Sequence, residues 1–269
     1  MKIFFSFISA FFDQKEIVYI NEDELISGAI NEIKKSNLIA VDTEFIWRNT
    51  YFPSLSLIQI STHNKIFIFD MYQNNNLIEL KKIFESNEIK KIFHSLRSDI
   101  SVLKSALNVK VLNVFDTQIA ESILVNNSSI QIGYKDLVKK YLLISISKNE
   151  TNSDWSKRPL KPNQMEYAAN DVRYLIRIMQ TQIIKLKKMK LLEVFNNLCL
   201  KERQFGEEDF SISRLRRLKK KNKKLTPLDE KIFLWREDEA KNKNLPPNNI
   251  FKVNHISRLN DVIQRKDSK

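Results

Sequence analysis

The pattern of apolar and polar positions predicts a chain that begins mainly with β-strands and continues mainly with helices. Continuous or alternating apolar runs predict strands, and apolar positions three and four residues apart predict helices. Strands are expected at 38–41, 54–61, 65–71 and 89–93, and the short connections among the first three favour antiparallel neighbours. Helices are expected at 22–35, from 77, and at 99–107, 117–124 and 134–141, with a long one from about 162. This order predicts an α/β domain with a mixed sheet.

A break in the pattern falls near Arg214. The run 214–224 holds eight basic residues in eleven and no acid. A fresh helix start follows, with Thr226 as the cap, Pro227 at the first helical position and Asp229 in the first turn. An apolar stretch at 3–12 lies at the other end, and we expect an N-terminal extension or an edge strand there rather than a signal peptide.

Composition narrows the classes of protein that remain. Of the 269 residues 42% are hydrophobic, which is enough for a core and excludes a fully disordered or fibrous protein. Cys199 is the single cysteine, so neither a disulfide framework nor a thiolate metal cluster is possible, and a reducing, cytoplasmic setting is expected. Three glycines leave no glycine-rich phosphate loop.

The charge is strongly positive and unevenly distributed. The net charge is +13, and residues 201–269, with 19 basic and 11 acidic residues, contribute +8 of it. Such an excess indicates an anionic partner, with nucleic acid as the first candidate, while a lysine-rich solvated surface is the alternative reading.

Carboxylates occur where a buried strand should not hold them. The apolar run 39–41 leads directly into Asp42 and Glu44, whose side chains share one face of a strand. Two neighbouring carboxylates repel, so this pair predicts either a strand end turned to solvent or a divalent cation between the acids. Asp99 follows the strand at 89–93, where an acid in the first turn of a helix is the simpler explanation. Tyr167 and Asp171, four residues apart, lie side by side on the long helix, where a surface pair is the simpler explanation.

Taken together, these motifs resemble the DEDD superfamily of 3′→5′ exonucleases, in the subclass with tyrosine in the third motif. The first motif matches as Asp42-Thr43-Glu44, the second as Phe93-His94-Ser95 followed by Asp99, and the third as the stretch from Tyr167 to Leu175. Flanking stretches at 41–45, 51–60, 114–118 and 154–160 narrow the resemblance to the ribonuclease D family, over roughly residues 16–200. The implied fold is a ribonuclease H-like mixed sheet flanked by helices, the DEDD exonuclease fold, followed by a small all-helical C-terminal segment.

The resemblance implies a chemistry that suits these residues. Asp42, Glu44, Asp99 and Asp171 would hold two Mg²⁺ or Mn²⁺ ions roughly 3.5 to 4 Å apart, which activate a water and stabilise the leaving 3′ oxygen. Tyr167 would orient the attacking water. Contacts to the substrate, or support of the site, are expected from three further polar residues, His94, Gln59 and Asp116.

The resemblance also suggests how the chain is divided. We expect an N-terminal extension at 1–15, an exonuclease domain at 16–205, a basic linker at 206–225 and a partial HRDC-like helical region at 226–269. That last region has about half the length of one helical nucleic-acid-binding module of the family. RNA binding is therefore expected to depend on the basic run, with its main contacts at four residues, Arg216, Arg217, Lys219 and Lys220.

The expected function is a metal-dependent 3′→5′ exoribonuclease that trims structured RNA such as tRNA precursors, with no membrane and no obligate protein partner. Two alternatives remain open from the sequence. One is a DNA-directed 3′→5′ exonuclease, because the same motifs serve both substrates. The other is a non-catalytic RNA-binding protein on the same fold, which the intact set of four acids disfavours.

Overall fold

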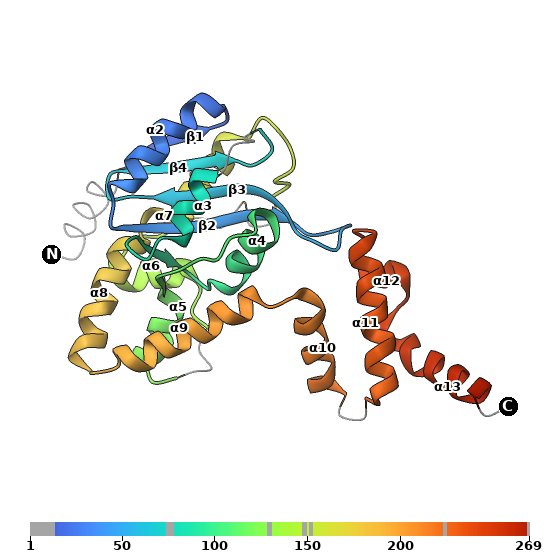
Figure 1. The fold of residues 1–269 in the computed structure, drawn as a ribbon. Helices are drawn as coiled ribbons and strands as arrows, with labels where there is room; N and C mark the ends of the chain where they lie inside the picture. Colours follow the sequence, from blue (N-terminus) through green and yellow to red (C-terminus); the bar gives the residue numbers. More distant parts are fainter. Residues whose placement is uncertain are drawn as a thin grey trace. The chain divides into compact units, whose positions relative to one another are not determined.

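The computed structural model describes residues 14–73, 78–127, 131–146, 150, 153–222 and 225–267 (Figure 1). The expectation for 3–12 lies outside these residues. The chain forms two compact units. The first comprises the residues up to Ile46 together with Leu55–Gly206, and the second comprises Trp47–Ser54 together with the residues from Glu207 onward.

The first unit is built on a six-stranded mixed sheet, as expected. The strands lie in the order β1-β4-β3-β2-β5-β6. β3 and β4 pair antiparallel, whereas β1 with β4, β2 with β5 and β5 with β6 pair parallel. Their bounds are β1 Glu16–Ile20, β2 Leu38–Ile46, β3 Ser54–Ser61, β4 Lys65–Asp70, β5 Lys90–Phe93 and β6 Val114–Asp116.

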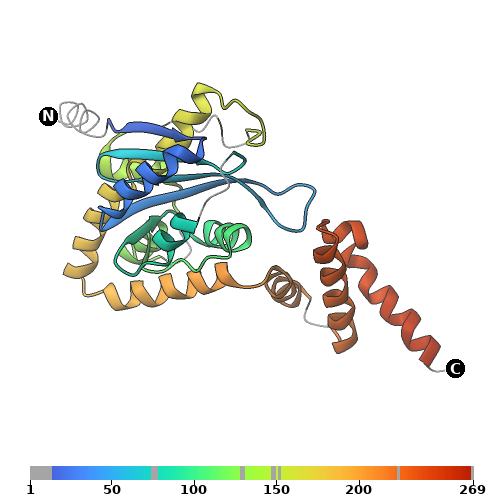
Figure 2. The ribbon, with the colours of Figure 1, turned by 45° about the horizontal axis from the view of Figure 1, so that its top comes forward.

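Helices cover both faces of this sheet, as Figures 1 and 2 show. One core lies on the side of α2, α3 and α4 and includes Ile39 and Val41 of β2. The other lies on the side of α7 and α8 and includes Ala40. Because side chains alternate along a strand, Thr43 belongs to the first face, and Asp42 and Glu44 belong to the second. The helices of this unit are α2 Asp23–Lys34, α3 Ile78–Glu85, α4 Arg97–Leu107, α5 Thr117–Leu124, α6 Tyr134–Leu142, α7 Pro162–Arg173, α8 Leu175–Lys188 and α9 Leu192–Glu207.

The long helix expected from residue 162 is in fact two helices, and a side chain separates them. The hydroxyl of Tyr134 donates to the carbonyl oxygen of Asn170 at 2.9 Å, and it accepts a hydrogen bond from the backbone N–H of Tyr174 at 3.3 Å. These two backbone groups would bond each other in a continuous helix, so the inserted hydroxyl interrupts the ladder. Helix α7 therefore ends at Arg173, two residues after Asp171.

The second unit combines four helices with a loop from the other end of the chain. Its helices are α10 Phe210–Lys221, α11 Pro227–Asn242, α12 Pro247–Ile250 and α13 Ile256–Asp267. Thr226 caps α11 as expected: its hydroxyl accepts from the backbone N–H of Asp229 at 3.1 Å, and Oδ2 of Asp229 accepts from the backbone N–H of Thr226 at 2.9 Å. The range expected as a basic linker, 206–225, holds the whole of helix α10.

The loop Trp47–Ser54 is held in this second unit by aromatic and polar contacts. The guanidinium carbon of Arg214 lies 4.6 Å from the ring centre of Tyr51 and 5.6 Å from that of Trp47. Oδ1 of Asn244 accepts hydrogen bonds from the backbone N–H groups of Tyr51 and Phe52 at 3.1 and 3.2 Å. Arg214 also pairs with Glu237, which is fully buried.

Across the residues that the structure describes, every helix is too short or too polar to cross a lipid bilayer.

Candidate functional site

Three carboxylates from the first and third motifs meet on one face of the sheet. Asp42 at the centre of β2 and Glu44 two residues later lie on the side covered by α7, and Asp171 lies in the last turn of α7. One carboxylate oxygen from each residue lies within 4.8 Å of the other two. The structure thus brings together the first and third motifs, which are far apart in the sequence.

Asp99 of the second motif reaches this region from the opposite face of β2. It is buried in the first turn of α4, and its Oδ1 accepts a hydrogen bond from the hydroxyl of Thr43 at 2.6 Å. Asp99 is not one of the three acids within 4.8 Å of one another. Its charge still reaches them, because it contributes to raising the pKa of Glu44.

The electrostatics of this cluster follow from burial and mutual repulsion. Burial, the Asp42 charge and then the Asp171 and Asp99 charges raise the pKa of Glu44 to about 10. Burial and the Asp171 charge raise the pKa of Asp42 well above its ordinary value, and burial and the Asp42 charge do the same for Asp99. Such a cluster disfavours its own ionised form, and a cation among the acids relieves the repulsion.

The acidic cluster fits hard divalent cations. Its donors are carboxylate oxygens, which Mg²⁺ and Mn²⁺ prefer, and they converge although their charges repel. Asp42, Glu44 and Asp171 could therefore hold a cation directly, with Asp99 close enough to contribute. The number and identity of the cations stay predictions.

Tyr167 lies on the same helix as Asp171, one turn earlier. Its ring is half-buried and lies 6.0 Å, centre to centre, from the ring of Trp155. Tyr134, which the sequence analysis did not single out, is partly buried beside this region, and burial followed by the Asp171 charge raises its pKa. No local sequence signal identifies Tyr134, because its role depends on insertion into a helix 36 positions further along the chain.

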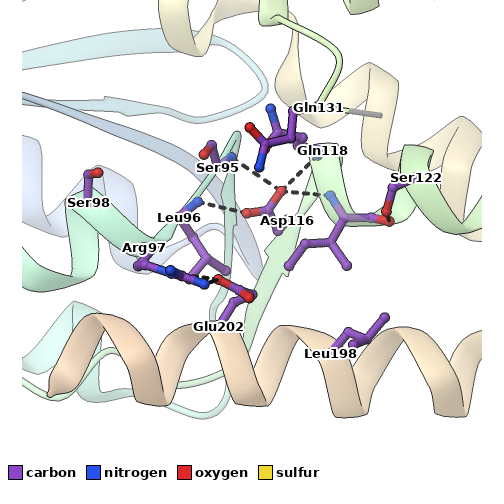
Figure 3. Close-up of a pocket in the computed structure, with 11 residues that line it drawn as sticks. Ser95, Leu96, Arg97, Ser98, Asp116, Gln118, Ser122, Gln131, Leu198 and Glu202 are labelled. Carbon is purple, nitrogen blue, oxygen red and sulfur yellow. Dashed lines mark hydrogen bonds and ion pairs between the residues drawn. The ribbon is translucent and has the colours of Figure 1, made fainter. Parts of the chain in front are cut away.

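Asp116 supports the turn of the second motif through backbone hydrogen bonds. It is 1% exposed, and its carboxylate accepts hydrogen bonds from four backbone N–H groups (Figure 3). Two of these precede α4 and two begin α5: they belong to Ser95, Leu96, Gln118 and Ile119. These bonds join the turn that leads into Asp99 to the start of α5, which is the supporting role expected for Asp116, and its contact with substrate stays a prediction. A pocket of about 360 Å³ opens beside this turn, and Arg97 and Glu202 pair on its lower side in Figure 3.

His94 and Gln59 differ in their access to solvent. His94 is half-buried, with Nδ1 3.0 Å from the hydroxyl of Thr117, and its contact with substrate stays a prediction. Gln59 is fully buried in the middle of β3, which leaves its side chain no surface for a substrate. Its burial is compatible with support of the site, the second of the two roles expected for Gln59, and that role stays a prediction.

The four basic residues expected to bind RNA lie on helix α10 of the second unit. Arg216 forms an ion pair with Glu208, and Lys219 forms one with Glu230 at 2.7 Å. Arg217 and Lys220 are exposed, and neither forms an ion pair with a residue that the structure describes. Contact of all four with RNA stays a prediction.

Comparison with known proteins agrees with the fold and the motifs. A family model described as 3′-5′ exonuclease matches residues 17–189. Ribonuclease D of Desulfotalea psychrophila is 29% identical over 245 residues, which cover 89% of this chain and 64% of that protein. The crystal structure of Escherichia coli RNase D superposes with a TM-score of 0.81 at 24% identity, over 90% of this chain and 65% of that one. The structure of Brucella melitensis NrnC with bound Mg²⁺ gives a TM-score of 0.63 at 26% identity, over 71% of this chain and 92% of that one.

The chain therefore belongs to the 3′-5′ exonuclease family. Its similarity to curated ribonuclease D proteins agrees with the resemblance drawn from the motifs. The chain spans less than two thirds of the length of the curated ribonuclease D relatives it matches first.

Proposed function

We propose that the chain is a metal-dependent 3′→5′ exoribonuclease that removes nucleotides from the 3′ ends of structured RNA, such as tRNA precursors, as 5′ nucleoside monophosphates. The observation that carries the proposal is the convergence of Asp42, Glu44 and Asp171 within 4.8 Å, with Asp99 bonded to the intervening Thr43. A protein that only bound RNA would gain nothing from four carboxylates that repel one another in a confined site.

The acids and the tyrosine have separate roles in this proposal. Asp42, Glu44, Asp99 and Asp171 hold two divalent cations, Mg²⁺ or Mn²⁺. When bound, the cations make water a stronger nucleophile and offset the negative charge that develops on the phosphate and the leaving oxygen. The hydroxyl of Tyr167 orients the attacking water by hydrogen bonding. Asp171 follows one helical turn later, so both side chains lie on the side of α7 that faces Asp42 and Glu44.

RNA is favoured over DNA by the relatives rather than by the site itself. The E. coli neighbour is described as an exoribonuclease involved in structured RNA processing. Under this proposal the basic side chains of the protein bind the phosphate backbone of the RNA, and the exposed basic residues of helix α10 contribute most. His94 contacts the terminal nucleotide.

The test is a time course on RNA and on DNA labelled at the 5′ end. The 3′ end should carry either a free hydroxyl or a phosphate block, and the buffer should contain Mg²⁺, Mn²⁺ or a chelator. We expect a descending ladder from RNA with a free 3′ hydroxyl, stepwise release of nucleoside monophosphates and no products with chelator. Asp171→Ala should fold and bind RNA but produce no ladder.

Three results would contradict the proposal. A ladder that persists in chelator or in Asp171→Ala would exclude the assigned metal site. Faster degradation of DNA than of RNA would favour the DNA-directed alternative. RNA binding without products under every condition would favour the binding protein.

A further inference from the structure

A partly buried arginine, Arg158, holds the loop that packs against Tyr167. Nε and Nη2 of Arg158 donate to both carboxylate oxygens of Asp70, the Nη2 bond being 2.9 Å long. Nη1 of Arg158 donates to the carbonyl oxygens of Trp155 and Lys157 at 2.9 Å each. Its side chain is only 14% exposed, and the Asp70 side chain is fully buried. Because each of its terminal nitrogens is engaged inside the protein, Arg158 is a poor candidate for binding phosphate.

The clamp is reinforced from the sheet. The hydroxyl of Ser56 in β3 also donates to the carbonyl oxygen of Trp155, and Nη2 of Arg158 lies 3.1 Å from that hydroxyl. The hydroxyl of Tyr19 in β1 donates to Asp70. Burial alone would raise the pKa of Asp70, but the bonds from Arg158 and Tyr19 hold it below its ordinary value, so the pair is charged at neutral pH.

The side chain of Trp155 depends on this anchor for its position. The ring is 3% exposed and belongs to the core that contains Ala168 and Ala169 of α7. Its Nε1–H finds no hydrogen-bond acceptor among the described residues, so only packing and the anchored backbone fix the ring. Its plane is tilted by 42° to the ring of Tyr167, with the two centres 6.0 Å apart.

We infer that Arg158 is a positioning residue for the reaction. It anchors Trp155 beside the ring of Tyr167, and the packing of the two rings fixes the position of the Tyr167 hydroxyl. The inference rests on the proposed function. Arg158 acts on turnover only through Tyr167 and has no contact with RNA or metal. A displaced Trp155 leaves the Tyr167 ring free to tilt, and displacements of about 1 Å at a reacting group can cost roughly 10²-fold in rate.

A double-mutant cycle between Arg158→Lys and Tyr167→Phe tests this. Lysine keeps the charge opposite Asp70, but it lacks the fork that reaches the carbonyl of Trp155. The steady-state kcat and KM are measured on a 3′-hydroxyl oligoribonucleotide with Mn²⁺. We expect Arg158→Lys to lower kcat by about 10- to 100-fold with KM unchanged. In the Tyr167→Phe background, where the hydroxyl is absent, the same change should have little further effect on kcat.

Two companion variants separate positioning from general loss of stability. Arg203→Lys replaces a buried arginine, which donates to the carbonyl of Val111 in the other core, and should leave kcat unchanged. Ser56→Ala removes the second anchor of the Trp155 carbonyl and takes the place of Arg158→Lys in the cycle if that variant does not fold. Thermal unfolding of each variant shows that it is folded at the assay temperature.

The inference is overturned if Arg158→Lys lowers kcat equally in both backgrounds, if it raises KM instead, or if it leaves wild-type kcat unchanged. A wild-type protein without chelator-sensitive RNA degradation would overturn the proposed function and this inference together. Asp171→Ala could abolish activity while Arg158→Lys and Tyr167→Phe have independent effects on kcat. That result would overturn the positioning role of Arg158 and leave the proposed function standing.

Discussion

The hydroxyl of Thr43 donates a 2.6 Å hydrogen bond to Oδ1 of Asp99. Thr43 stands between Asp42 and Glu44 on β2, and its side chain points to the opposite face of the sheet, toward α4. The first and second motifs are therefore joined by a direct bond between two buried side chains. The acid that lies outside the three-carboxylate cluster is thereby fixed in register with it.

Replacing Thr43 by valine should loosen this register. Valine has nearly the same shape but no hydroxyl, so Asp99 loses a buried hydrogen bond, which we expect to lower the free energy of unfolding by about 1 to 2 kcal/mol. Turnover should fall more than RNA affinity. Urea unfolding and saturating kinetics measure the two effects, and Thr43→Ser, which keeps the hydroxyl, is the control. Full activity in Thr43→Val would show that the bond does not position Asp99.

Cation binding should stabilise the folded protein through the acidic cluster. A ligand that binds only the folded state at 100 times its Kd adds about 2.7 kcal/mol to the free energy of unfolding, so the wild-type Tm should rise with added Mn²⁺. Glu44→Gln imitates the uncharged carboxyl that burial and the neighbouring acids favour in the metal-free protein. Its metal-free Tm should therefore equal or exceed that of the wild type, and the rise with Mn²⁺ should disappear. Glu88→Gln, at an exposed acid far along the sequence, should keep the wild-type response. A full Mn²⁺ response in Glu44→Gln would place the cation elsewhere.

The exposed and the paired cations of helix α10 should contribute unequally to RNA binding. Each phosphate contact adds roughly 0.7 to the slope of log K against log salt for a single strand. Changing Arg217 and Lys220 to glutamine should therefore flatten the slope by up to about 1.4. The matched change of Arg216 and Lys219 should flatten it less, because Glu208 and Glu230 already neutralise those charges. Salt titrations of RNA affinity measure both slopes. Unchanged slopes in both proteins would indicate that the basic run is a solvated surface and does not bind RNA.

Two glycines should respond oppositely to alanine. At Gly206 in α9, an added Cβ would lie 2.8 Å from the carbonyl oxygen of Arg97 and from Cβ of Ile100. Gly206→Ala should therefore push against α4 and cost about 1 to 3 kcal/mol. At Gly28, exposed within α2, nothing lies within 4 Å of an added Cβ, and alanine should add about 1 kcal/mol through helix propensity. The denaturant midpoints of the two variants show whether each substitution stabilises or destabilises the protein. A stabilising Gly206→Ala would contradict close packing of α9 on α4.

Lys91 should make stability depend on pH. Its side chain is fully buried and donates to the carbonyl oxygens of Ser86 and Ile89, and burial lowers the pKa of Lys91 from 10.5 to about 7. Between these two values the unfolded chain holds a proton that the folded protein lacks, so the free energy of unfolding should rise with pH, by at most about 1.4 kcal/mol per pH unit. Below pH 7 both states are protonated and the penalty is complete.

The comparison of wild type with Lys91→Met isolates this effect. The stability advantage of Lys91→Met, measured by urea unfolding, should be largest near pH 6 and shrink as the pH rises to 10. Lys110→Met, at an exposed lysine, should show no such trend. A constant difference between wild type and Lys91→Met would show that Lys91 stays charged in the folded protein.

The sequence predicted the elements well where the signal is local. The runs around Val41 and Ile92 are apolar enough to be recognised as strands, and the first and third motifs identified the three acids that meet in space. The capping residues of α11 were also legible, because Thr226 and Asp229 bond within one turn.

Features that depend on distant contacts were not predictable. The division of the long helix at Tyr174 requires the hydroxyl of Tyr134, and nothing near Tyr174 signals it. The four backbone partners of Asp116 lie on two segments, one of them about 20 positions away, so its supporting hydrogen bonds were not legible either. The role of Arg158 is invisible in the sequence for the same reason, because Asp70 lies 88 positions away.

The loop Trp47–Ser54 makes the helical unit discontinuous along the chain, and this affects its synthesis. Tyr51 and Asn244, which bond each other, are 193 positions apart. At a ribosomal rate of about 5 to 20 residues per second, Tyr51 leaves the ribosome roughly 10 to 40 s before Asn244 is made. The aromatic side chains of the loop can form their contacts with α10 and α11 only after those helices have been synthesised. The turn that joins β2, with its two acids, to β3 is therefore among the last parts of the protein to reach its final packing.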